Sequence, residues 1–386
     1  MKSCNQQINA NRVRIAETPT LGKNVIIQAD EVVLGRGVRI ADDVEIVCDC
    51  LQLGDNCTVG KGTVLLGPEV MCAEGCSLGA SVHAELNYYF RLGKCSVIGS
   101  RTVFSGQGVQ AGEFLWMKGD CIVGGGGAQG PRSYLTIGDR CTIVDKCYLN
   151  LSEEITIGDS TALSYNVALL THGAWQPVLM GFGAKFGPVH IGSNSVVYLN
   201  AVVMPGVTIG DYCTVGAGSI VNCDVPHHSL VAGNPARVIR TGDYPSPLSR
   251  PQIDLLINSV LRDYLMTLEP KGVRILEGAD LARQYAVLEF MNQRHVLAFS
   301  TAEQIAAFDG QPDITIAFGE TPRSYPGKCH FNLAALTATG ELTRIGEDLR
   351  DYLRRRAIRI FTGRPFCALP PANLCRLRAR RLEKDK

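Results

Sequence analysis

Apolar residues recur at every sixth position over much of the chain. In residues 191–226 the aliphatic positions are Ile191, Val197, Val203, Ile209, Val215 and Val221. The same step occurs upstream, in triplets, at Leu34, Ile40, Ile46, Leu53, Val59, Leu65, Ile137, Ile143, Leu149, Ile157, Leu163 and Leu169. A period of six fits neither an α-helix, which repeats every 3.6 residues or so, nor one alternating strand. It predicts a short strand followed by a tight turn, with every sixth side chain in a common core.

Repetition of this unit predicts a parallel β-helix. Three hexads form one triangular coil, and stacked coils give each strand parallel neighbours above and below. Glycine often follows the aliphatic residue, and we expect it to supply the backbone freedom that the turns require. These glycines are Gly35, Gly54, Gly60, Gly138, Gly158, Gly192, Gly210 and Gly216. A β-sandwich would space its strands about 8–12 residues apart and would not hold this register. The period does not determine the handedness of the helix.

The register breaks in two places. Residues 67–136 follow it poorly and contain a glycine cluster at 123–131, which lacks the Lys-Ser/Thr of a phosphate-binding loop. We predict a protrusion or an irregular coil there, with degraded coils such as LGKCSVIGS. The second break separates Leu169 from Ile191 by 22 residues. Its aromatic, Gly and Pro content predicts a loop at 170–190 that leaves the helix at Thr171-His172 and returns.

The last third of the chain has a different pattern. After Arg240 the segment TGDYPSPLSRP is typical of a linker, and the residues beyond it alternate between helical spacing and short β-rich runs. The sequence therefore predicts a mainly β protein in three parts. They are an N-terminal segment (1–24), a β-helix domain (25–240) and a smaller α/β domain (241–386).

Composition excludes several classes of protein. Lys and Arg total 38 against 37 Asp and Glu, so charge gives no reason to expect nucleic acid as a partner. No signal-peptide core and no membrane-length apolar stretch is present, which favours a soluble cytoplasmic protein. Fifteen cysteines occur, four of them (Cys57, Cys95, Cys141 and Cys213) at one repeat position and without zinc-site spacing. We expect them to be small buried side chains and predict no metal.

Four segments carry a resemblance to a known family. They are PGVTIGD (205–211), VGAGSIV (215–221), DVP (224–226) and AGNPARVIR (232–240). Together they resemble the carboxy-terminal coils of hexapeptide-repeat acyltransferases, especially sugar O-acetyltransferases of the galactoside and maltose acetyltransferase type. The resemblance covers residues 137–240 well and continues more weakly back to residue 25. It implies a left-handed β-helix, acetyl-CoA as acyl donor, a sugar-like acceptor, and a homotrimer with active sites between neighbouring helices.

The resemblance also implies a catalytic base. A histidine at the start of the protruding loop has this role in the family, and by position it is His172. An acceptor hydroxyl is a poor nucleophile until its proton is removed, and imidazole titrates in the range suited to that task. The other six histidines lack this position at the entry to a loop. His190, for example, directly precedes the inward Ile191 and is expected to point outward.

Further site residues are assigned by the same resemblance. Asn150 matches an acceptor-binding asparagine one coil before the histidine, although a structural role at a coil corner is an equal alternative. Trp175, within the loop, is also predicted to bind the acceptor. The turn at Gly216-Ala217 is predicted to contact acyl-CoA. Arg237 and Arg240 are predicted to contact its phosphates. The chain departs from the family pattern at Tyr198-Leu199 and at Cys223, in the regions of the acyl and phosphate contacts.

The sequence thus predicts an acyl-CoA-dependent O-acyltransferase that acts on a sugar or polysaccharide precursor. The nearest alternative is an N-acyltransferase acting on an amino-sugar nucleotide. A γ-type carbonic anhydrase would need three histidine ligands, and only His172 and His190 are placed for that role. A non-catalytic β-helix scaffold is the remaining alternative.

Overall fold

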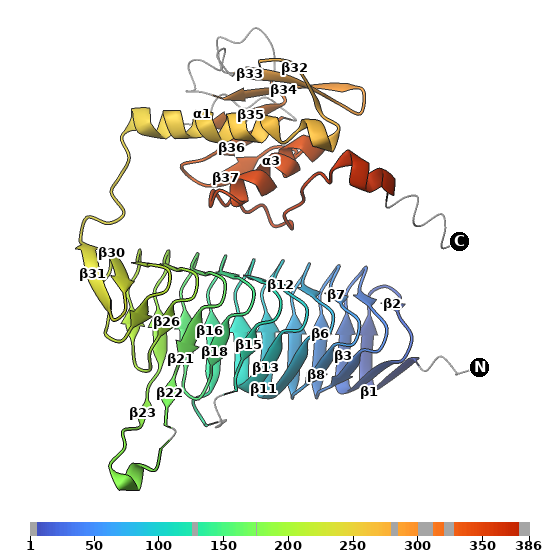
Figure 1. Ribbon diagram of the computed structural model, residues 1–386. Coiled ribbons are helices and arrows are strands. Elements are labelled where there is room, and N and C mark those ends of the chain that lie inside the picture. Colours follow the sequence, from blue (N-terminus) through green and yellow to red (C-terminus); the bar gives the residue numbers. More distant parts are fainter. Residues whose placement is uncertain are drawn as a thin grey trace. The chain divides into compact units, whose positions relative to one another are not determined.

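The chain forms two compact units, Met1–Ser246 and Pro247–Lys386, which are described separately. A computed structural model describes residues 6–125, 130–174, 176–278, 285–299, 312–319 and 328–377. The first unit is a parallel β-helix and the second a smaller unit with one sheet and helices (Figure 1). The predicted fold class is confirmed.

The β-helix has one 17-stranded and one 12-stranded sheet. The longer sheet contains β1 (Gln6–Ile15), β3 (Val25–Leu34), β5 (Glu45–Val47), β6 (Cys50–Leu53), β8 (Val64–Leu66), β9 (Glu69–Cys72), β11 (His83–Leu92), β13 (Val103–Ala111), β15 (Ile122–Val123), β16 (Tyr134–Ile137), β18 (Tyr148–Asn150), β19 (Ile155–Ile157), β21 (Ala168–Leu170), β24 (Val189–Ile191), β26 (Val202–Val203), β27 (Thr208–Ile209) and β29 (Ile220–Val221). The shorter sheet contains β2 (Thr20–Leu21), β4 (Arg39–Ile40), β7 (Thr58–Val59), β10 (Ser77–Leu78), β12 (Val97–Ile98), β14 (Trp116–Met117), β17 (Thr142–Ile143), β20 (Ala162–Leu163), β25 (Val196–Val197), β28 (Thr214–Val215), β30 (Ser229–Gly233) and β31 (Ala236–Thr241).

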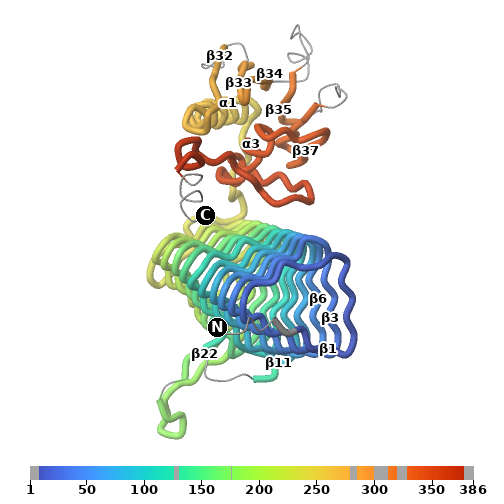
Figure 2. Tube along the Cα trace, turned by 90° about the vertical axis from the view of Figure 1, so that its right-hand side faces the viewer, coloured from blue at the N-terminus to red at the C-terminus, as the bar shows by residue number. Residues whose placement is uncertain are grey.

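Coils stack with equivalent residues superposed (Figure 2). Leu149 pairs with Leu169, which pairs with Val203 on the next coil. All predicted aliphatic positions lie in the core, and none is more than 3% exposed. The four repeat-position cysteines are also buried, and the Cys141 thiol donates to the Gly158 carbonyl at 3.1 Å. The hexad register is therefore confirmed, and so is the role of Cys57, Cys141 and Cys213 as small core residues. Cys95 instead stands one place earlier in its hexad, at a left-handed turn position (φ 55°), and is not part of this core.

The glycines after the aliphatic residues have a different role from the predicted one. A Cβ on Gly158 would lie 2.6 Å from the Ser193 nitrogen, and one on Gly192 would lie 2.5 Å from Asp211 Oδ1. Glycine is needed here because the next coil approaches too closely for a side chain. The left-handed conformation occurs two residues later, for example at Ser160 (φ 55°) and Asn194 (φ 55°). Backbone freedom was thus the wrong explanation for these glycines, since steric exclusion by the next coil explains them.

Stacked coils are found in the described parts of residues 67–136, and the one that contains the glycine cluster is irregular, as predicted, since Ala111 pairs with Ile137, 26 residues on, whereas Leu92 pairs with Ala111, 19 residues on. Cys72, Leu92, Ala111 and Ile137 pair in register on successive strands and are all buried. Because cysteine and alanine occupy inward positions here, a pattern sought in aliphatic residues missed these coils. The coils also begin before residue 25, since β1 pairs with β3 from Gln6 onward. Residues 126–129 of the glycine cluster lie outside the described part of the chain.

The second unit contains a six-stranded mixed sheet in the order of the chain. Its strands are β32 (Arg274–Glu277), β33 (Tyr285–Phe290), β34 (Gln293–Phe299), β35 (Ile314–Ala317), β36 (Cys329–Asn332) and β37 (Thr337–Thr339), and its helices are α1 (Arg250–Met266), η2 (Glu269–Lys271) and α3 (Arg344–Arg354). Helix α1 begins with a capping box between Ser249 and Gln252. Tyr264 from α1 and Leu349 from α3 belong to one apolar core with strand residues such as Phe331.

Candidate functional site

A hairpin leaves the β-helix after β21 and returns at β24 (Figure 1). Its strands β22 (His172–Gly173) and β23 (Lys185–Phe186) are antiparallel, and the 3-10 turn η1 (Val178–Met180) lies between them. The Gly187 amide donates to the Thr171 carbonyl at 3.0 Å and closes the base of the hairpin. The excursion predicted at 170–190 is therefore present, and His172 lies where it leaves the helix.

His172 is held through one ring nitrogen. Its Nδ1 lies 2.6 Å from Asn150 Oδ1 and 3.1 Å from Ser152 Oγ, and its ring stacks on Phe186 at a centroid distance of 5.7 Å. An amide oxygen can only accept a hydrogen bond, so Nδ1 is the protonated nitrogen. Nε2 then carries the free lone pair. This tautomer is the one that a general base acting through Nε2 requires.

The orientation of the Asn150 amide follows from its other contacts. Its Nδ2 donates to the Tyr148 hydroxyl at 3.0 Å, and that hydroxyl donates to the Gly125 carbonyl at 3.1 Å. Its Oδ1 also lies 3.4 Å from the Thr171 amide nitrogen. Exchanging the oxygen and nitrogen would place donors against donors. Asn150 is 2% exposed, so the amide that contacts the imidazole is itself buried, although the chain of bonds behind it reaches the surface at Gly125.

Thr171 connects the two coils at this corner. Its hydroxyl donates to the Asn150 carbonyl at 2.6 Å and accepts from the Ser152 and Glu153 amides at 2.9 and 3.0 Å. Every one of these polar groups is buried or nearly so and has a partner, which makes the corner rigid. Glu153 also forms an ion pair with Arg132 at 2.5 Å. The hydrogen bond from Arg132 lowers the pKa of the Glu153 carboxyl.

The sequence predicts His172 and Asn150 as site residues, which the structure places in contact, but it does not single out Tyr148, Ser152 and Thr171 beside them. A signal for them exists in the chain. Residues 148–152 precede His172 by about one coil length, so they occupy the same corner of the adjacent coil, with Tyr148 opposite Ala168. A search one coil upstream of the histidine for polar residues would have identified them.

The predicted acyl-CoA turn lies at another corner of the helix. Gly216-Ala217 joins β28 to β29, whereas His172 lies between β21 and β24. Ala217 is exposed, and the neighbouring Gly218 amide donates to the Leu199 carbonyl at 2.8 Å. The departures at Tyr198-Leu199 therefore lie directly beside this turn, on the preceding coil. Within one chain the structure does not bring the turn to His172.

The remaining predicted residues are dispersed. Arg237 and Arg240 are exposed on β31, the second strand of the antiparallel hairpin that ends the helix. Arg240 already contacts Asp243 Oδ2 at 3.2 Å and Ser246 Oγ at 2.7 Å. Cys223 is exposed and lies at the same corner of the triangular coil as His172, two coils further along the helix. Trp175 lies outside the described residues.

No group of three or more His, Cys, Asp or Glu residues in the described ranges is arranged to hold a metal ion. His190 lies on the outward side of β24, where its Nδ1 is 2.6 Å from Thr156 Oγ1. Within the same ranges, no helix has both the length and the apolar character needed to cross a membrane.

Part of the β-helix matches a known family model. Residues 188–223 match the family model described as bacterial transferase hexapeptide (six repeats). A Staphylococcus aureus (strain COL) protein, provisionally named an acetyltransferase, is 51% identical over 63 residues, which are 16% of this chain and 32% of that protein. Galactoside O-acetyltransferase of Escherichia coli (strain K12) is 38% identical over 120 residues, which are 28% of this chain and 58% of the enzyme. The resemblance predicted from the sequence is confirmed.

Among solved structures, an acetyltransferase of Vibrio cholerae in complex with acetyl coenzyme A is similar. Its identity is 31%, its TM-score is 0.26, and the match covers 28% of this chain and 60% of the other. In each of these comparisons this chain spans less than two thirds of the relative.

Proposed function

We propose that the protein transfers an acetyl or other short acyl group from acyl-CoA to a hydroxyl of a sugar or polysaccharide precursor, with His172 as the general base. The observation that carries the proposal is the His172–Asn150 contact. Because Nδ1 carries the proton in this contact, Nε2 has the lone pair that can accept a proton, and the ring lies at the start of the hairpin. The similarity to an O-acetyltransferase supports the class of reaction.

In the proposed reaction, Nε2 removes the proton of the acceptor hydroxyl as its oxygen attacks the thioester carbonyl. A tetrahedral intermediate forms, and its negative oxygen requires hydrogen-bond donors. The intermediate collapses with cleavage of the carbon–sulfur bond. The imidazolium then returns its proton to the departing thiolate, so that the products are an ester and free CoA.

Asn150 is proposed to position the base. Its side chain is buried and occupied by His172, Tyr148 and Thr171, so its contacts support this role more than direct binding of the acceptor. Its amide oxygen accepts from Nδ1 and so leaves the lone pair of the neutral ring on Nε2.

The site is proposed to be completed by a second copy of the chain in a homotrimer. His172 and the Gly216-Ala217 turn lie at different corners, and a neighbouring helix can bring its own turn to His172. The hairpin tip supports association, because Leu179 is 99% exposed and Val178 and Met180 are exposed beside it. Arg237 and Arg240 remain the proposed contacts for CoA phosphates.

The test is release of the CoA thiol in the presence of acetyl-CoA and a panel of sugars and nucleotide sugars. His172→Ala is expected to lower turnover by about 10²–10⁴-fold, the usual contribution of a general base. His190→Ala is the matched control, since that imidazole also has a hydroxyl partner, Thr156, but lies on the outward side of β24, where the hairpin has returned to the helix. Equal turnover in wild type and His172→Ala would refute the assignment. Base-labile products indicate O-acylation, and base-stable products indicate the N-acyl alternative.

A further inference from the structure

Three tyrosines gather at a bulge in the β-helix. Tyr134 stacks against Tyr88 and Tyr89 at centroid distances of 6.3 and 5.9 Å. Between Leu86 and Tyr89, strand β11 has one residue more than its partner β13, and the register shifts there. Tyr88 is 56% exposed. Most of its ring therefore faces solvent, although a ring of this size is more stable when covered.

Polar groups lie between and beside these rings. Asn87 Nδ2 donates to Gln107 Oε1 at 3.2 Å, and Gln107 Nε2 donates to the Gly130 carbonyl at 3.0 Å. On the other side, the Arg91 guanidinium lies 4.5 Å from the Tyr89 ring centroid and forms an ion pair with Glu69. Asn87 and Arg91 are thus the polar groups beside the tyrosine faces at the surface, while Gln107 is buried beneath them.

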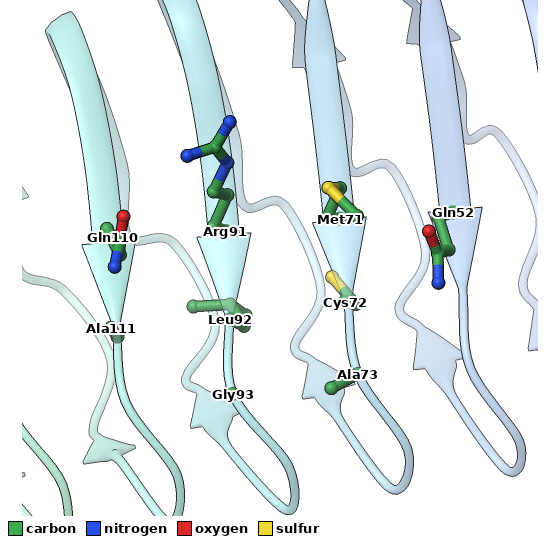
Figure 3. A pocket seen from close by; sticks show the side chains of 9 residues that line it. All are labelled: Gln52, Met71, Cys72, Ala73, Arg91, Leu92, Gly93, Gln110 and Ala111. Carbon is green, nitrogen blue, oxygen red and sulfur yellow. The ribbon is translucent and has the colours of Figure 1, made fainter.

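This surface continues into a shallow hollow. Gln52, Met71, Arg91 and Gln110 lie side by side on β6, β9, β11 and β13 and line a space of about 240 Å³ (Figure 3). The four side chains form one row, in the order Gln110, Arg91, Met71 and Gln52, so that polar groups lie on both sides of the methionine (Figure 3). Arg91 belongs to both the hollow and the tyrosine cluster, so the two form one continuous surface.

The tyrosine cluster lies on the same edge of the helix as His172. The strands of this edge pair in the order β11, β13, β16, β19 and β24, and His172 lies on the coil of β24. Figures 1 and 2 both show the β11 corner and β22 at that edge (Figure 1; Figure 2). With adjacent strands ~4.8 Å apart, Tyr134 is about 10 Å and Tyr89 about 19 Å from the His172 coil along the axis.

We propose that this edge binds an extended carbohydrate chain, so that the acceptor is an oligosaccharide or polysaccharide rather than a single sugar. The proposal rests on the acyl transfer proposed above. A pyranose ring has an apolar face of C–H groups and an edge of hydroxyls, which match tyrosine faces flanked by amides. The reacting sugar lies at His172, and the sugars that precede or follow it cover Tyr134, Tyr88 and Tyr89. The acceptor then gains affinity with length until it spans the edge.

The experiment measures acceptor length dependence in the full-length protein. The probes are β-1,4-linked N-acetylglucosamine oligomers and β-linked galactose oligomers, each from monomer to pentamer. In wild type, kcat/KM for at least one series is expected to rise about tenfold or more with length. In Tyr88→Ala/Tyr134→Ala the ratio of pentamer to monomer is expected to fall to near one. Phenylalanine at both positions should restore the ratio, because it keeps the ring faces. Tyr212→Ala, which removes an exposed tyrosine between β27 and β28, should not change it.

Binding without acyl donor separates this proposal from the proposed function. Calorimetry with His172→Ala is expected to show the same increase of affinity with oligomer length. In the triple variant His172→Ala/Tyr88→Ala/Tyr134→Ala this increase is expected to be lost. If no acyl transfer is observed but this binding pattern is, the glycan surface stands and the function fails. Flat length dependence in both assays overturns the glycan surface. So does a change of oligomeric state in the tyrosine variant by sedimentation, which would assign the rings to a contact between copies.

Discussion

Truncation of Asn150 tests how the catalytic tautomer is held. Asn150→Ala removes the oxygen that accepts from His172 Nδ1 at 2.6 Å and leaves Ser152 Oγ, at 3.1 Å, as a second partner of that nitrogen. Loss of one buried hydrogen bond costs about 1–3 kcal/mol. Because about 1.4 kcal/mol corresponds to a tenfold change in rate, kcat is expected to fall about 5- to 150-fold. Partial replacement by Ser152 favours the lower half of that range.

The division between kcat and KM distinguishes two roles. If Asn150 positions the base, kcat falls and the KM for the acceptor changes little, since the acceptor keeps its contacts. If Asn150 binds the acceptor, as its sequence position suggests, KM rises. Steady-state acyl transfer at saturating acetyl-CoA measures both constants. Asn150→Ala/Ser152→Ala should lower kcat further, toward that of His172→Ala.

Two controls make the result interpretable. Asn150 also supports Thr171 and Tyr148, so the variant must first be shown to be folded by circular dichroism and thermal unfolding. Asn11→Ala is a matched variant, because Asn11 donates to Asp30 on the exposed surface of β1, many coils before the site. An unchanged kcat in a folded Asn150→Ala protein would refute the positioning role. A raised KM with normal kcat would establish acceptor binding in its place.

Three further predictions concern the scaffold. Gly192→Ala should lower the free energy of unfolding in urea by roughly 1–3 kcal/mol, since its Cβ would lie 2.5 Å from Asp211 Oδ1, whereas Gly183→Ala, with no atom nearby, should have little effect. Iodoacetamide labelling of the folded protein, followed by mass spectrometry, should modify the exposed Cys223, Cys367 and Cys375. Cys48 should remain unmodified, because burial raises its pKa to about 12 and little thiolate is present. Rapid labelling of Cys48 would contradict this. Because Arg132 lowers the pKa of Glu153, their bond stabilises the fold above the ordinary value of 4.5 and is lost as pH falls through the lower folded value. The stability difference between wild type and Arg132→Ala should therefore shrink below about pH 4.5, and a constant difference would contradict the assignment.

The sequence predicts those parts of the fold that a strict period imposes. Positions such as Val203 and Leu169 could be assigned to the core because a stacked coil requires an apolar residue at each sixth place. The same reasoning missed Cys72 and Ala111, which fill the core with smaller side chains. It also misjudged Gly158, because the closeness of the next coil is a property of stacking and not of the local turn.

At the candidate site, the sequence predicted His172 but not the residues that contact it. His172 could be found because a loop interrupts the register at that residue. Its partners on the adjacent coil are about 20 residues away in sequence and are brought to it only by the stacking of coils. Gly216-Ala217 and His172 are separated because their turns lie at different corners of the triangular coil. A sequence motif does not specify the corner at which its turn lies.

The last hairpin of the β-helix has a consequence for self-assembly. A stack of parallel coils would present its final strands, with unpaired N–H and C=O groups, to the first strands of another molecule and so grow into a fibre. In the shorter sheet β31 turns back antiparallel to β30, so the outermost strand runs against the direction of every coil before it. It bears charged residues, among them Arg237 and Arg240, on an exposed surface. A second molecule that added its first strands to β31 could not continue the parallel pairing and would have to bury these charged side chains. Closed assemblies through the sides of the helix are therefore favoured over open filaments along its axis.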